Sequence, residues 1–542
     1  MSLQNIKIVI ASNNKRIPKW QYNLISRIIT TGGLNELSII IDNNTSELKY
    51  RNFYDRLNRY FYFLYKKIDK MLFAKKVDEK EDPFVTFNLN EKNVYQDKIR
   101  FIDIDKESEL VEQNIDIIIS FCSEKSTNKL LKHVNKGILT IGFGDGFFYK
   151  GVPPFFWEIY DNRSVCETVL KLHTLNNPEG IVIARAYSDT MKLSLIKNLR
   201  HNIRIVEGLI INQLKIISLQ DIKQDDTPEN ITKNSSRKIR DRVPSIGEML
   251  IFLIKLLVRL SKRFYVKRFV EDQWFLGIRK KQPSDHSFDL SARKFDVIKQ
   301  PKDSFYADPF IINYEGENYI FFEDYPFSTK KGVISFIKID ENGKFDDPKI
   351  ALEREHHLSY PFIFEYDNNL YMMPESYCNR TLELYECVEF PDKWKIIKTI
   401  FKDVLIADAT IIKHDNLYWL FASMAEHESA LNVELHIFYS NSPLGEWTPH
   451  FLNPVVCDIK TARPAGNIFL YNNEIYRPSQ DCSERYGYAL NFNKVEVLSK
   501  KEYKETLVNK VLPDFIPECY AIHTYNANEQ FELIDFLKYS IQ

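Results

Sequence analysis

The stretch ADPFIINYEGENYIFFEDY, residues 307–325, decides the fold of the second half of the chain. It contains an apolar strand, a polar turn and a second strand that opens with an aromatic residue. Four more segments repeat this order, at residues 359–377, 407–424, 463–481 and 519–536. A hairpin that recurs at a period of ~50 residues is typical of a propeller blade with four strands.

The spacing of the repeats supports a closed ring. The third residues of the five segments are separated by 52, 48, 56 and 56 positions: Pro309, Pro361, Ala409, Ala465 and Ala521. Closing a ring of blades removes exposed sheet edges. We therefore predict an all-β five-bladed propeller over residues 271–542, with the strand Trp274–Arg279 as the outer strand of the last blade.

The first 210 residues differ, because strand-like runs alternate there with helical patterns. The expected strands are Ile6–Ala11, Leu37–Asp42, Ile115–Cys122, Ile138–Phe143 and Ile181–Ala186. The expected helices are Lys19–Thr30, Arg51–Phe73, Glu107–Gln113, Ser126–Asn135 and Thr190–Asn198. Short, fully apolar strands that alternate with helices are typical of a parallel sheet covered on both faces. We predict an α/β domain built on such a sheet over residues 1–210.

Residues 211–270 are expected to link the two domains. A polar stretch at residues 220–242 has no apolar periodicity, and SIGEMLIFLIKLLVRLSKRFYVKRF follows at residues 245–269. Lys255 and Arg259 interrupt its apolar core, so the helix is too short and too charged to span a bilayer comfortably. Two interpretations stay open: a helix packed between domains, or a basic amphipathic helix on an anionic membrane surface.

Composition excludes several classes of protein. The 542 residues carry 73 Lys and Arg against 74 Asp and Glu, which argues against a nucleic-acid binder that works by bulk charge. Seven cysteines without a C-x-x-C pair predict neither a disulfide framework nor a zinc site. We expect no metal site, and the sequence indicates no particular cofactor or oligomeric state. The first apolar run is too short for a signal peptide, so the expected location is the cytoplasm, with peripheral contact at the inner membrane face if the basic helix binds lipid.

The propeller funnel is the expected active site, because the innermost strands of all blades converge there. We predict three catalytic carboxylates: Asp308, Asp408 and Glu375. We predict five substrate-binding residues: Tyr360, Arg463, Asp324, Asp481 and His523. Carboxylates accept pairs of sugar hydroxyls, aromatic rings stack on sugar faces, and a guanidinium binds phosphate or carboxylate. The predicted ligand is a sugar or nucleotide sugar.

Two motifs resemble the five-bladed arabinofuranosidase, xylosidase and fructosidase clans. Asp308 in YADPF and Asp408 in IADAT fit the general base and the second Asp of those enzymes. The fourth inner strand of those enzymes supplies a Glu general acid, but here TARPAG at residues 461–466 places Arg463 there. Glycoside cleavage needs two carboxyl groups, one of which gives a proton. A hydrolase is therefore disfavoured, unless Glu375 or His523 substitutes.

The same half is more similar to the N-terminal region of glucosamine inositolphosphorylceramide transferases. The resemblance rests on four motifs: HLSYPF at 357–362, MPES at 373–376, FYSNSPLGEW at 438–447 and NPVV at 453–456. The resemblance spans roughly residues 305–536 and implies work on glycans or amino sugars.

The N-terminal half contains NIDIIIS at 114–120 and KGVPPFFWEI at 150–159. In these segments it resembles the formyltransferase N-domain, which implies a Rossmann-like α/β fold over residues 1–210. The Asn, His and Asp of that family's chemistry fall here at Thr140, Gly142 and Asn177 or Pro178, so all three are missing. Asp145 and His173 are the only nearby candidates, and we expect His173 to be a core residue with satisfied hydrogen bonds. Backbone N–H groups of Gly142, Gly144 and Gly146 remain candidates to bind an anion.

These observations favour a carbohydrate-directed transferase in bacterial-type surface glycan synthesis, with a degenerate formyl-transfer domain. Three alternatives stay open: a non-catalytic glycan-binding or scaffold protein, a glycosidase, and residual N-formyl or N-acyl transfer to an amino sugar. General acid–base groups contribute roughly 10²–10⁴ in rate, so loss of all three family residues disfavours formyl transfer.

Overall fold

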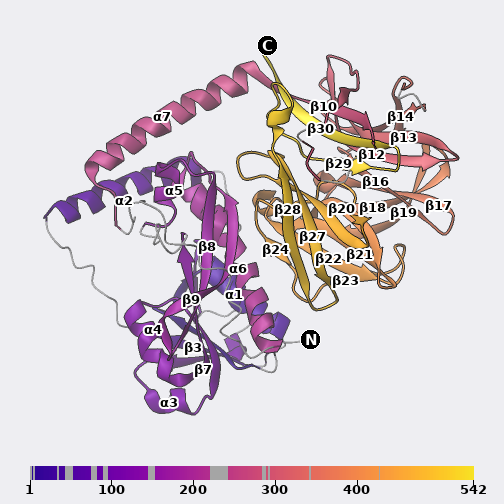
Figure 1. Ribbon diagram of the computed structural model, residues 1–542. Coiled ribbons are helices and arrows are strands. Elements are labelled where there is room, and N and C mark those ends of the chain that lie inside the picture. The colour runs from indigo at the N-terminus through magenta and orange to yellow at the C-terminus, as the bar shows by residue number, and fades with distance from the viewer. Residues whose placement is uncertain are drawn as a thin grey trace. The chain divides into compact units, whose positions relative to one another are not determined.

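The computed structural model describes residues 3, 6–32, 34, 36–42, 53–74, 82–89, 96–144, 153–219, 242–282, 288–290, 293–340, 344–425 and 428–541. The chain divides into two compact units, Met1–Ser261 and Lys262–Gln542. We call them the α/β unit and the propeller unit, and describe each by itself (Figure 1).

The α/β unit is built on a seven-stranded sheet of order β5-β3-β1-β6-β7-β8-β9. The parallel part comprises β5 (Ile99–Asp103), β3 (Leu37–Ile41), β1 (Ile8–Ser12), β6 (Ile115–Ser120) and β7 (Val134–Phe143). The remaining strands, β8 (Val165–Thr174) and β9 (Asn177–Asp189), are antiparallel. The α/β sheet is confirmed, but the expectation of an all-parallel sheet is wrong at this edge. A two-residue connection joins β8 to β9, and so tight a hairpin requires antiparallel strands.

Helices lie between and after these strands. They are α1 (Lys19–Gly32), α2 (Phe53–Ala74), α3 (Glu107–Val111), α4 (Glu124–Leu130), α5 (Phe156–Tyr160), α6 (Leu195–Leu219) and α7 (Ile246–Phe269). A short two-stranded sheet, β2 (Arg16–Pro18) with β4 (Thr86–Asn88), accompanies them. The helix expected at residues 126–135 ends early, because the chain enters β7 at Val134. Helix α6 is far longer than the expected helix at 190–198 and continues past residue 210, since its apolar pattern runs on to Leu219.

The propeller unit has five blades, as the repeats predict. The first blade comprises β12 (Ser304–Tyr314), β13 (Glu317–Pro326), β14 (Val333–Ile339) and β15 (Lys349–Leu352), and the second comprises β16 (Ser359–Tyr366), β17 (Asn369–Ser376), β18 (Thr381–Glu389) and β19 (Lys393–Lys402). The third comprises β20 (Leu405–His414), β21 (Leu417–Ala425), β22 (Glu434–Ser440), β23 (Thr448–Pro449) and β24 (Val456–Cys457). The fourth comprises β25 (Phe469–Tyr471), β26 (Glu474–Asp481), β27 (Ala489–Leu498) and β28 (Tyr503–Val511).

The fifth blade closes the ring by joining the two ends of this unit. Its order is β29 (Tyr525–Ala527), β30 (Phe531–Ile541), β10 (Val270–Lys280) and β11 (Asp296–Val297). The segment 274–279 therefore completes the last blade, as expected. It is the third strand and not the outermost one, because the short β11 pairs with its outer edge.

Five hydrophobic clusters fill the spaces between neighbouring blades. One joins Phe321 of the first blade to Met372 of the second, and another joins Leu533 of the fifth blade to Ile320 of the first. The other three lie between the second and third, third and fourth, and fourth and fifth blades. Because every blade packs on both neighbours, the inner strands are held around one axis, and this arrangement positions the site.

Candidate functional site

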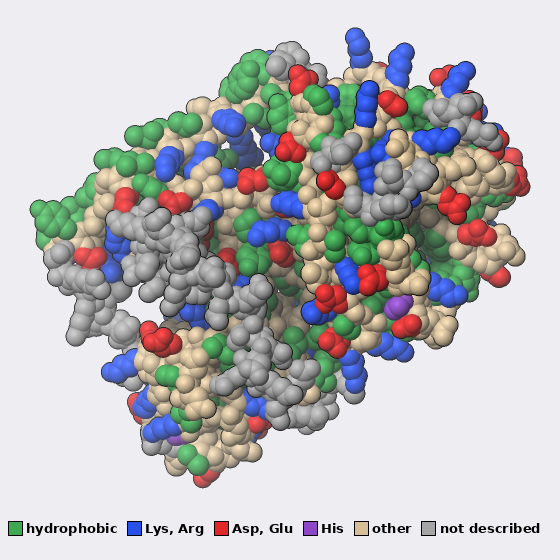
Figure 2. All heavy atoms as spheres, in the orientation of Figure 1, with side chains coloured by type: hydrophobic (Ala, Val, Ile, Leu, Met, Phe, Trp, Pro, Cys, Tyr) green, Lys and Arg blue, Asp and Glu red, His purple; other side chains and the backbone are tan. Residues whose placement is uncertain are grey.

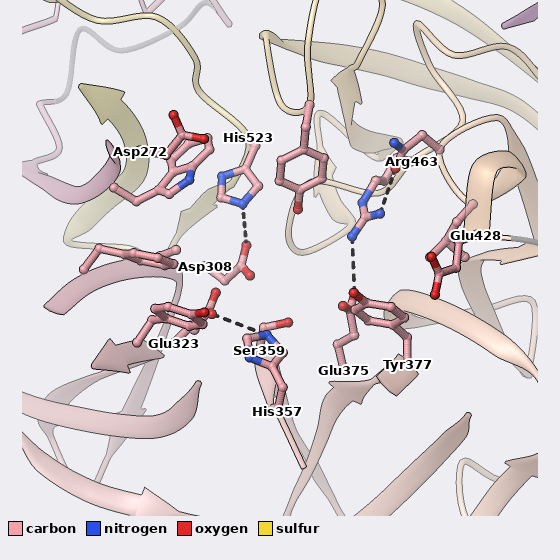
Figure 3. A pocket seen from close by; sticks show the side chains of 17 residues that line it. Asp272, Asp308, Glu323, His357, Ser359, Glu375, Tyr377, Glu428, Arg463 and His523 are labelled. Carbon is pink, nitrogen blue, oxygen red and sulfur yellow. Dashed lines mark hydrogen bonds and ion pairs between the residues drawn. The ribbon is translucent and has the colours of Figure 1, made fainter. Parts of the chain in front are cut away.

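A cavity of about 710 Å³ opens at one end of the propeller unit. Its volume lies within the range of small-molecule sites, roughly 300–1,000 Å³. Figure 3 shows its lining, which comprises Asp272, Trp274, Phe305, Ala307, Asp308, Glu323, Tyr325, His357, Ser359, Glu375, Tyr377, Glu428, Leu431, Asn432, Arg463, Tyr486 and His523. The lining is rich in carboxylates and aromatic rings, the side chains that suit a polyhydroxylated ligand.

The inner strands of the first three blades share a backbone irregularity at the site. Asp308, Tyr360 and Asp408 occupy the same repeat position and have φ of 52°, 44° and 51°. At each of them the pairing with the second strand of the blade shifts register. Left-handed backbone costs a non-glycine residue roughly 1–2 kcal/mol, and such strain gathers at functional sites.

Carboxylates of neighbouring blades stabilise two of these bulges. The Asp308 N–H donates to Asp535 Oδ2 at 2.9 Å, and the Asp408 N–H donates to Glu375 Oε2 at 3.1 Å. Asp535 and Glu375 both lie four residues after the aromatic that opens the second strand of their blade. One repeat position therefore supplies the carboxylate that binds the bulge of the next blade.

His523 lies between two carboxylates beside the cavity. Its Nδ1 is 2.7 Å from Asp535 Oδ2, and its Nε2 is 3.3 Å from Asp308 Oδ1. Thr524 Oγ1 donates to Asp308 Oδ1 at 2.7 Å, and the His523 ring packs against Trp274 with centroids 4.0 Å apart. These contacts fix the imidazole, so that its Nε2 faces the Asp308 carboxylate (Figure 3).

Burial and charge raise the pKa values of both members of this pair. Burial raises the pKa of Asp308 to about 6, although His523 opposes that rise. Burial lowers the pKa of His523, but Asp535 and Asp308 outweigh it, so the pKa of the imidazole lies above its ordinary value. A carboxylate with a pKa of about 6 beside an imidazole is suited to accept a proton.

A second buried carboxylate, Glu323, faces the cavity from β13. His357 Nε2 lies 3.4 Å from Glu323 Oε1, and the Gly332 N–H donates to His357 Nδ1 at 2.8 Å. Because Nδ1 accepts, the hydrogen-bond network assigns the ring proton to Nε2, toward Glu323. Burial lowers the pKa of His357 to about 4, and burial followed by the charge of Asp308 raises the pKa of Glu323 well above its usual range. A protonated Glu323 is able to donate to a ligand.

Arg463 joins the carboxylates on the other side of the cavity. Its Nε donates to Asp408 Oδ2 at 2.6 Å and its Nη1 to Asn432 Oδ1 at 2.8 Å. Its Nη2 lies 3.4 Å from Glu375 Oε2. Burial and the Asp408 charge nevertheless raise the pKa of Glu375 well above its usual range. Three of the guanidinium's contacts are thus within the protein, which leaves less of it for an anionic ligand than the sequence suggests.

Asp308, His523 and Asp535 raise the question of a metal, which the sequence does not predict. Each offers a donor atom within 4.8 Å of the others, a spacing that could hold an ion. The oxygens of Asp535, however, already accept the N–H groups of Asp308, His523 and Thr524. The two ring nitrogens of His523 also face different carboxylates. These contacts fit an oriented histidine better than a ligand set.

The structure brings four of the eight predicted site residues to the cavity wall: Asp308, Glu375, Arg463 and His523. Asp408 is buried behind Arg463 and accepts from it. Tyr360 is a correction: its hydroxyl accepts the Gly466 N–H at 2.7 Å and lies 2.9 Å from Thr410 Oγ1, which places it beneath the cavity.

Asp324 and Asp481 are also corrections, because neither lines the cavity. Side chains alternate along a strand, so Asp324 points away from the side that Glu323 faces. It accepts from Ser335 Oγ at 3.1 Å. Asp481 accepts from Lys510 Nζ at 2.5 Å, on the opposite side from Gln480.

Sequence reasoning missed Asp535, His357 and Tyr486. Asp535 carried a usable signal, since it occupies the same repeat position as Glu323 and Glu375. Tyr486 lies in a loop outside the repeats and stacks under the Arg463 guanidinium, 5.0 Å from ring centre to carbon. No repeat position indicates a loop residue of this kind.

The glycine-based anion site in the α/β unit is not supported where it is described. Gly142 lies within β7, and a side chain there would come within 2.6 Å of Val169 Cγ2, so close strand packing accounts for this glycine. The Gly144 N–H donates to the Glu167 carbonyl at 2.8 Å, which leaves it no proton for an anion. Gly146 and Asp145 lie outside the described residues.

His173 in the same unit has a partner on each ring nitrogen. Its Nε2 lies 2.7 Å from Thr140 Oγ1 and its Nδ1 lies 2.8 Å from the Pro178 carbonyl. A carbonyl only accepts, so Nδ1 carries the proton. The expectation of a satisfied core histidine is confirmed.

Comparison with known proteins identifies relatives of the propeller. The family described as "Glucosamine inositolphosphorylceramide transferase 1, N-terminal" matches residues 295–522. The rice protein of that name (Oryza sativa subsp. japonica) is 41% identical over 210 residues, which are 38% of this chain and 28% of the rice protein. The Arabidopsis thaliana protein is 43% identical over 211 residues, 38% of this chain and 27% of its own. The chain thus spans little more than a quarter of the curated relatives that it matches, and the predicted resemblance of the propeller is confirmed.

Solved structures of low similarity were also found. Zg3597, a family 117 glycoside hydrolase of Zobellia galactanivorans, has a TM-score of 0.32 and 12% identity, covering 49% of this chain and 90% of its own. The RS223 β-xylosidase has a TM-score of 0.31 and 11% identity, covering 39% and 80%.

Proposed function

We propose that the propeller unit is the active-site domain of a transferase that acts on a sugar or amino sugar. The observation that carries this proposal is the Asp535–His523–Asp308 arrangement at the wall of a cavity of sugar size. Named relatives of this region are glucosamine inositolphosphorylceramide transferases, which supports a carbohydrate-directed transferase.

Asp308 is the proposed general base. With a pKa of about 6 it is mostly ionised at neutral pH, yet basic enough to accept a proton. In the transfer, an acceptor hydroxyl or amine gives its proton to Asp308 as its oxygen or nitrogen bonds to the transferred carbon. The bond from that carbon to the leaving group breaks, and the leaving group keeps the electron pair. His523, held by Asp535, stabilises the Asp308 carboxylate before the proton arrives.

Glu323 and Glu375 are proposed to bind the substrate in their protonated forms. Their raised pKa values favour the protonated carboxyl, which donates a hydrogen bond and could protonate a leaving oxygen. Exposed Glu428 and Asp272 add negative charge to the cavity rim. A cavity with more carboxylates than guanidinium groups favours a cationic amino sugar over a polyanionic ligand.

The proposal is tested by Asp308→Asn in the full chain. Nucleotide sugars and amino sugars that raise the apparent melting temperature of the wild type identify ligands, because a native-state binder stabilises by mass action. We expect Asp308→Asn to keep binding such a ligand and to lose its turnover. A wild type that binds the ligand and never consumes it would instead indicate a glycan-binding protein.

A glycosidase is the second candidate, and the structure favours it more than the sequence does. The fourth blade lacks the general acid, but the raised pKa values of Glu323 and Glu375 offer a proton-bearing carboxyl within the same cavity. Release of free sugar from aryl glycosides by the wild type, abolished in Glu375→Gln, would favour hydrolysis over transfer.

Other parts of the account remain proposals. The seven cysteines are free, which fits the proposed cytoplasmic location and a role in bacterial-type surface glycan synthesis. The formyltransferase-type fold of residues 1–210 stays a prediction. Residual formyl or acyl transfer would have to proceed without His173, whose two nitrogens are already engaged.

A further inference from the structure

One side of helix α7 contacts the α/β unit through buried Met249 and Phe252 and through two charged side chains. Lys255 Nζ donates to the Tyr160 carbonyl at 2.9 Å, and Arg259 Nη2 donates to the Ile159 carbonyl at 2.8 Å. The opposite side carries Leu250, Ile254, Leu257 and Val258, each 58–64% exposed. The helix therefore carries a second row of apolar residues besides the one that faces the core. Met249 and Phe252, with Lys255 and Arg259, attach it to the α/β unit, and the aliphatic residues of the other side face solvent.

Helix α2 presents a second exposed apolar face. Nine large apolar residues of this helix are exposed, and these seven of them fall on one side of it by the helical repeat: Phe53, Tyr60, Phe61, Leu64, Ile68, Met71 and Leu72. Tyr62 and Tyr65, on the other side, are buried. The helix is therefore packed through one face and open through the other.

The two helices are held together, so their exposed faces belong to one surface. The rings of Tyr65 and Phe252 lie 5.1 Å apart, and the Ile246 N–H donates to Asn58 Oδ1 at 3.1 Å. Figure 2 shows hydrophobic side chains gathered along α7 and at the outer end of α2. We call this the α2–α7 face. Contiguous apolar patches larger than a few hundred Å² mark interaction sites in soluble domains.

The charge of the two helices is strongly one-sided. Helix α2 carries five Lys and Arg against two Asp, and α7 carries six against one Glu, whereas the whole chain is nearly balanced at 73 against 74. Lys67 and Lys70 on α2 are exposed, as are Lys262 and Arg263 on the next turn of α7. Among the described residues, no helix is long and apolar enough to cross a bilayer.

We propose that the α2–α7 face binds the surface of a membrane that contains anionic phospholipids. Exposed aliphatic and aromatic residues would enter the headgroup boundary by roughly 5–10 Å, and the basic residues would contact lipid phosphates. A second copy of the chain is the rival occupant. Lysine is depleted at protein–protein interfaces, so the lysines around this face favour lipid. This inference goes beyond the proposed transferase and does not depend on it.

The test is sedimentation of the full chain with two kinds of vesicle. One contains phosphatidylcholine alone, and the other contains equal parts of phosphatidylcholine and phosphatidylglycerol. We expect binding to the second kind that exceeds binding to the first by about tenfold or more, since each basic residue near an anionic surface contributes about 1 kcal/mol. Added salt should weaken the binding, because it screens charge.

Matched variants distinguish binding through the α2–α7 face from nonspecific hydrophobic adsorption to the vesicles. The triple variant Leu72→Ser, Ile254→Ser and Leu257→Ser should lower vesicle affinity by about tenfold or more, because three apolar contacts with the boundary are lost. The control variant Val388→Ser and Leu470→Ser changes residues that are 66% and 63% exposed on the propeller, and its affinity should stay at the wild-type value. The reversal Lys262→Glu with Arg263→Glu should weaken only the binding to anionic vesicles.

Two outcomes would overturn the proposal. One is equal sedimentation of the triple and control variants. The other is a wild type that ignores both vesicles and forms a dimer which the triple variant dissociates, as measured by analytical ultracentrifugation. Because all substitutions are at exposed positions, circular dichroism should show folded protein in every case.

Discussion

Each unit of this chain contains a buried histidine, and the two histidines differ in what their ring nitrogens contact. His173 of the α/β unit contacts a hydroxyl and a carbonyl, both uncharged, so neither ring nitrogen is left to act. His523 of the propeller unit lies between two carboxylates, at the wall of an open cavity. A buried histidine alone does not indicate a catalytic site. A histidine beside charged side chains that line an open cavity does.

The largest effect is expected from Asp308→Asn. This change keeps the shape and the Thr524 hydrogen bond but removes the base, so turnover should fall by roughly 10²–10⁴. It also removes one negative charge from a buried group of carboxylates, so the melting temperature should stay the same or rise. Steady-state rates and thermal unfolding on the same preparations measure both. A variant that retains turnover would remove Asp308 from the chemistry.

The pH dependence of turnover sharpens the comparison between the two histidines. Wild-type activity should rise as pH increases through about 6, because Asp308 must be ionised to act as a base. His523 holds down the pKa of Asp308, so His523→Gln should move this midpoint to higher pH. His173→Gln is the matched control and should leave the midpoint in place. Equal profiles for all three proteins would contradict the assigned roles.

Stability should respond most to the loss of Arg463. Arg463→Met leaves Asp408 buried without its cation, and breaking a buried pair from one side costs ~3–5 kcal/mol. The control is Lys398→Met, which loses an ion pair with 95% exposed Glu446 and hydrogen bonds to the Leu444 and Gly445 carbonyls, and the expected loss there is smaller. Urea unfolding of both variants gives the two free energies, and equal losses would show that Arg463 does not neutralise the cavity.

The smallest effect is expected in the α/β unit. His173→Leu leaves Thr140 Oγ1 and the Pro178 carbonyl without a partner, which costs ~1–3 kcal/mol of stability. Turnover by the folded enzyme should not change. Loss of activity without loss of stability would instead assign chemistry to the α/β unit and break the comparison.

The sequence predicts the propeller well because its information is repeated. Five hairpins, each with an aromatic 9–11 residues after the third residue of the repeat, fix the blades, and Asp308, Glu375, Arg463 and His523 lie at the cavity as expected. The errors arise where a shift of one residue along a strand decides whether a side chain faces the cavity. Asp324 follows Glu323 by one position and therefore faces away, and Tyr360 occupies the same bulge as Asp308 yet points beneath the cavity.

The α/β unit is harder to predict, because its features are not repeated. The antiparallel edge β8–β9 depends on one short connection, and the length of α6 depends on an apolar pattern without a clear stop signal. The outward apolar face of α7 could not be predicted either. The sequence shows that Lys255 and Arg259 are basic, but only the structure shows that they donate to carbonyls of the α/β unit.

We propose that the propeller cavity acts on a sugar through Asp308. The most direct measurement follows the fate of a nucleotide sugar or amino sugar that stabilises the full chain, with wild type and Asp308→Asn side by side. We predict that both proteins bind the ligand and that only the wild type converts it. Conversion at equal rates by both proteins would contradict the claim and direct the search to another part of the chain.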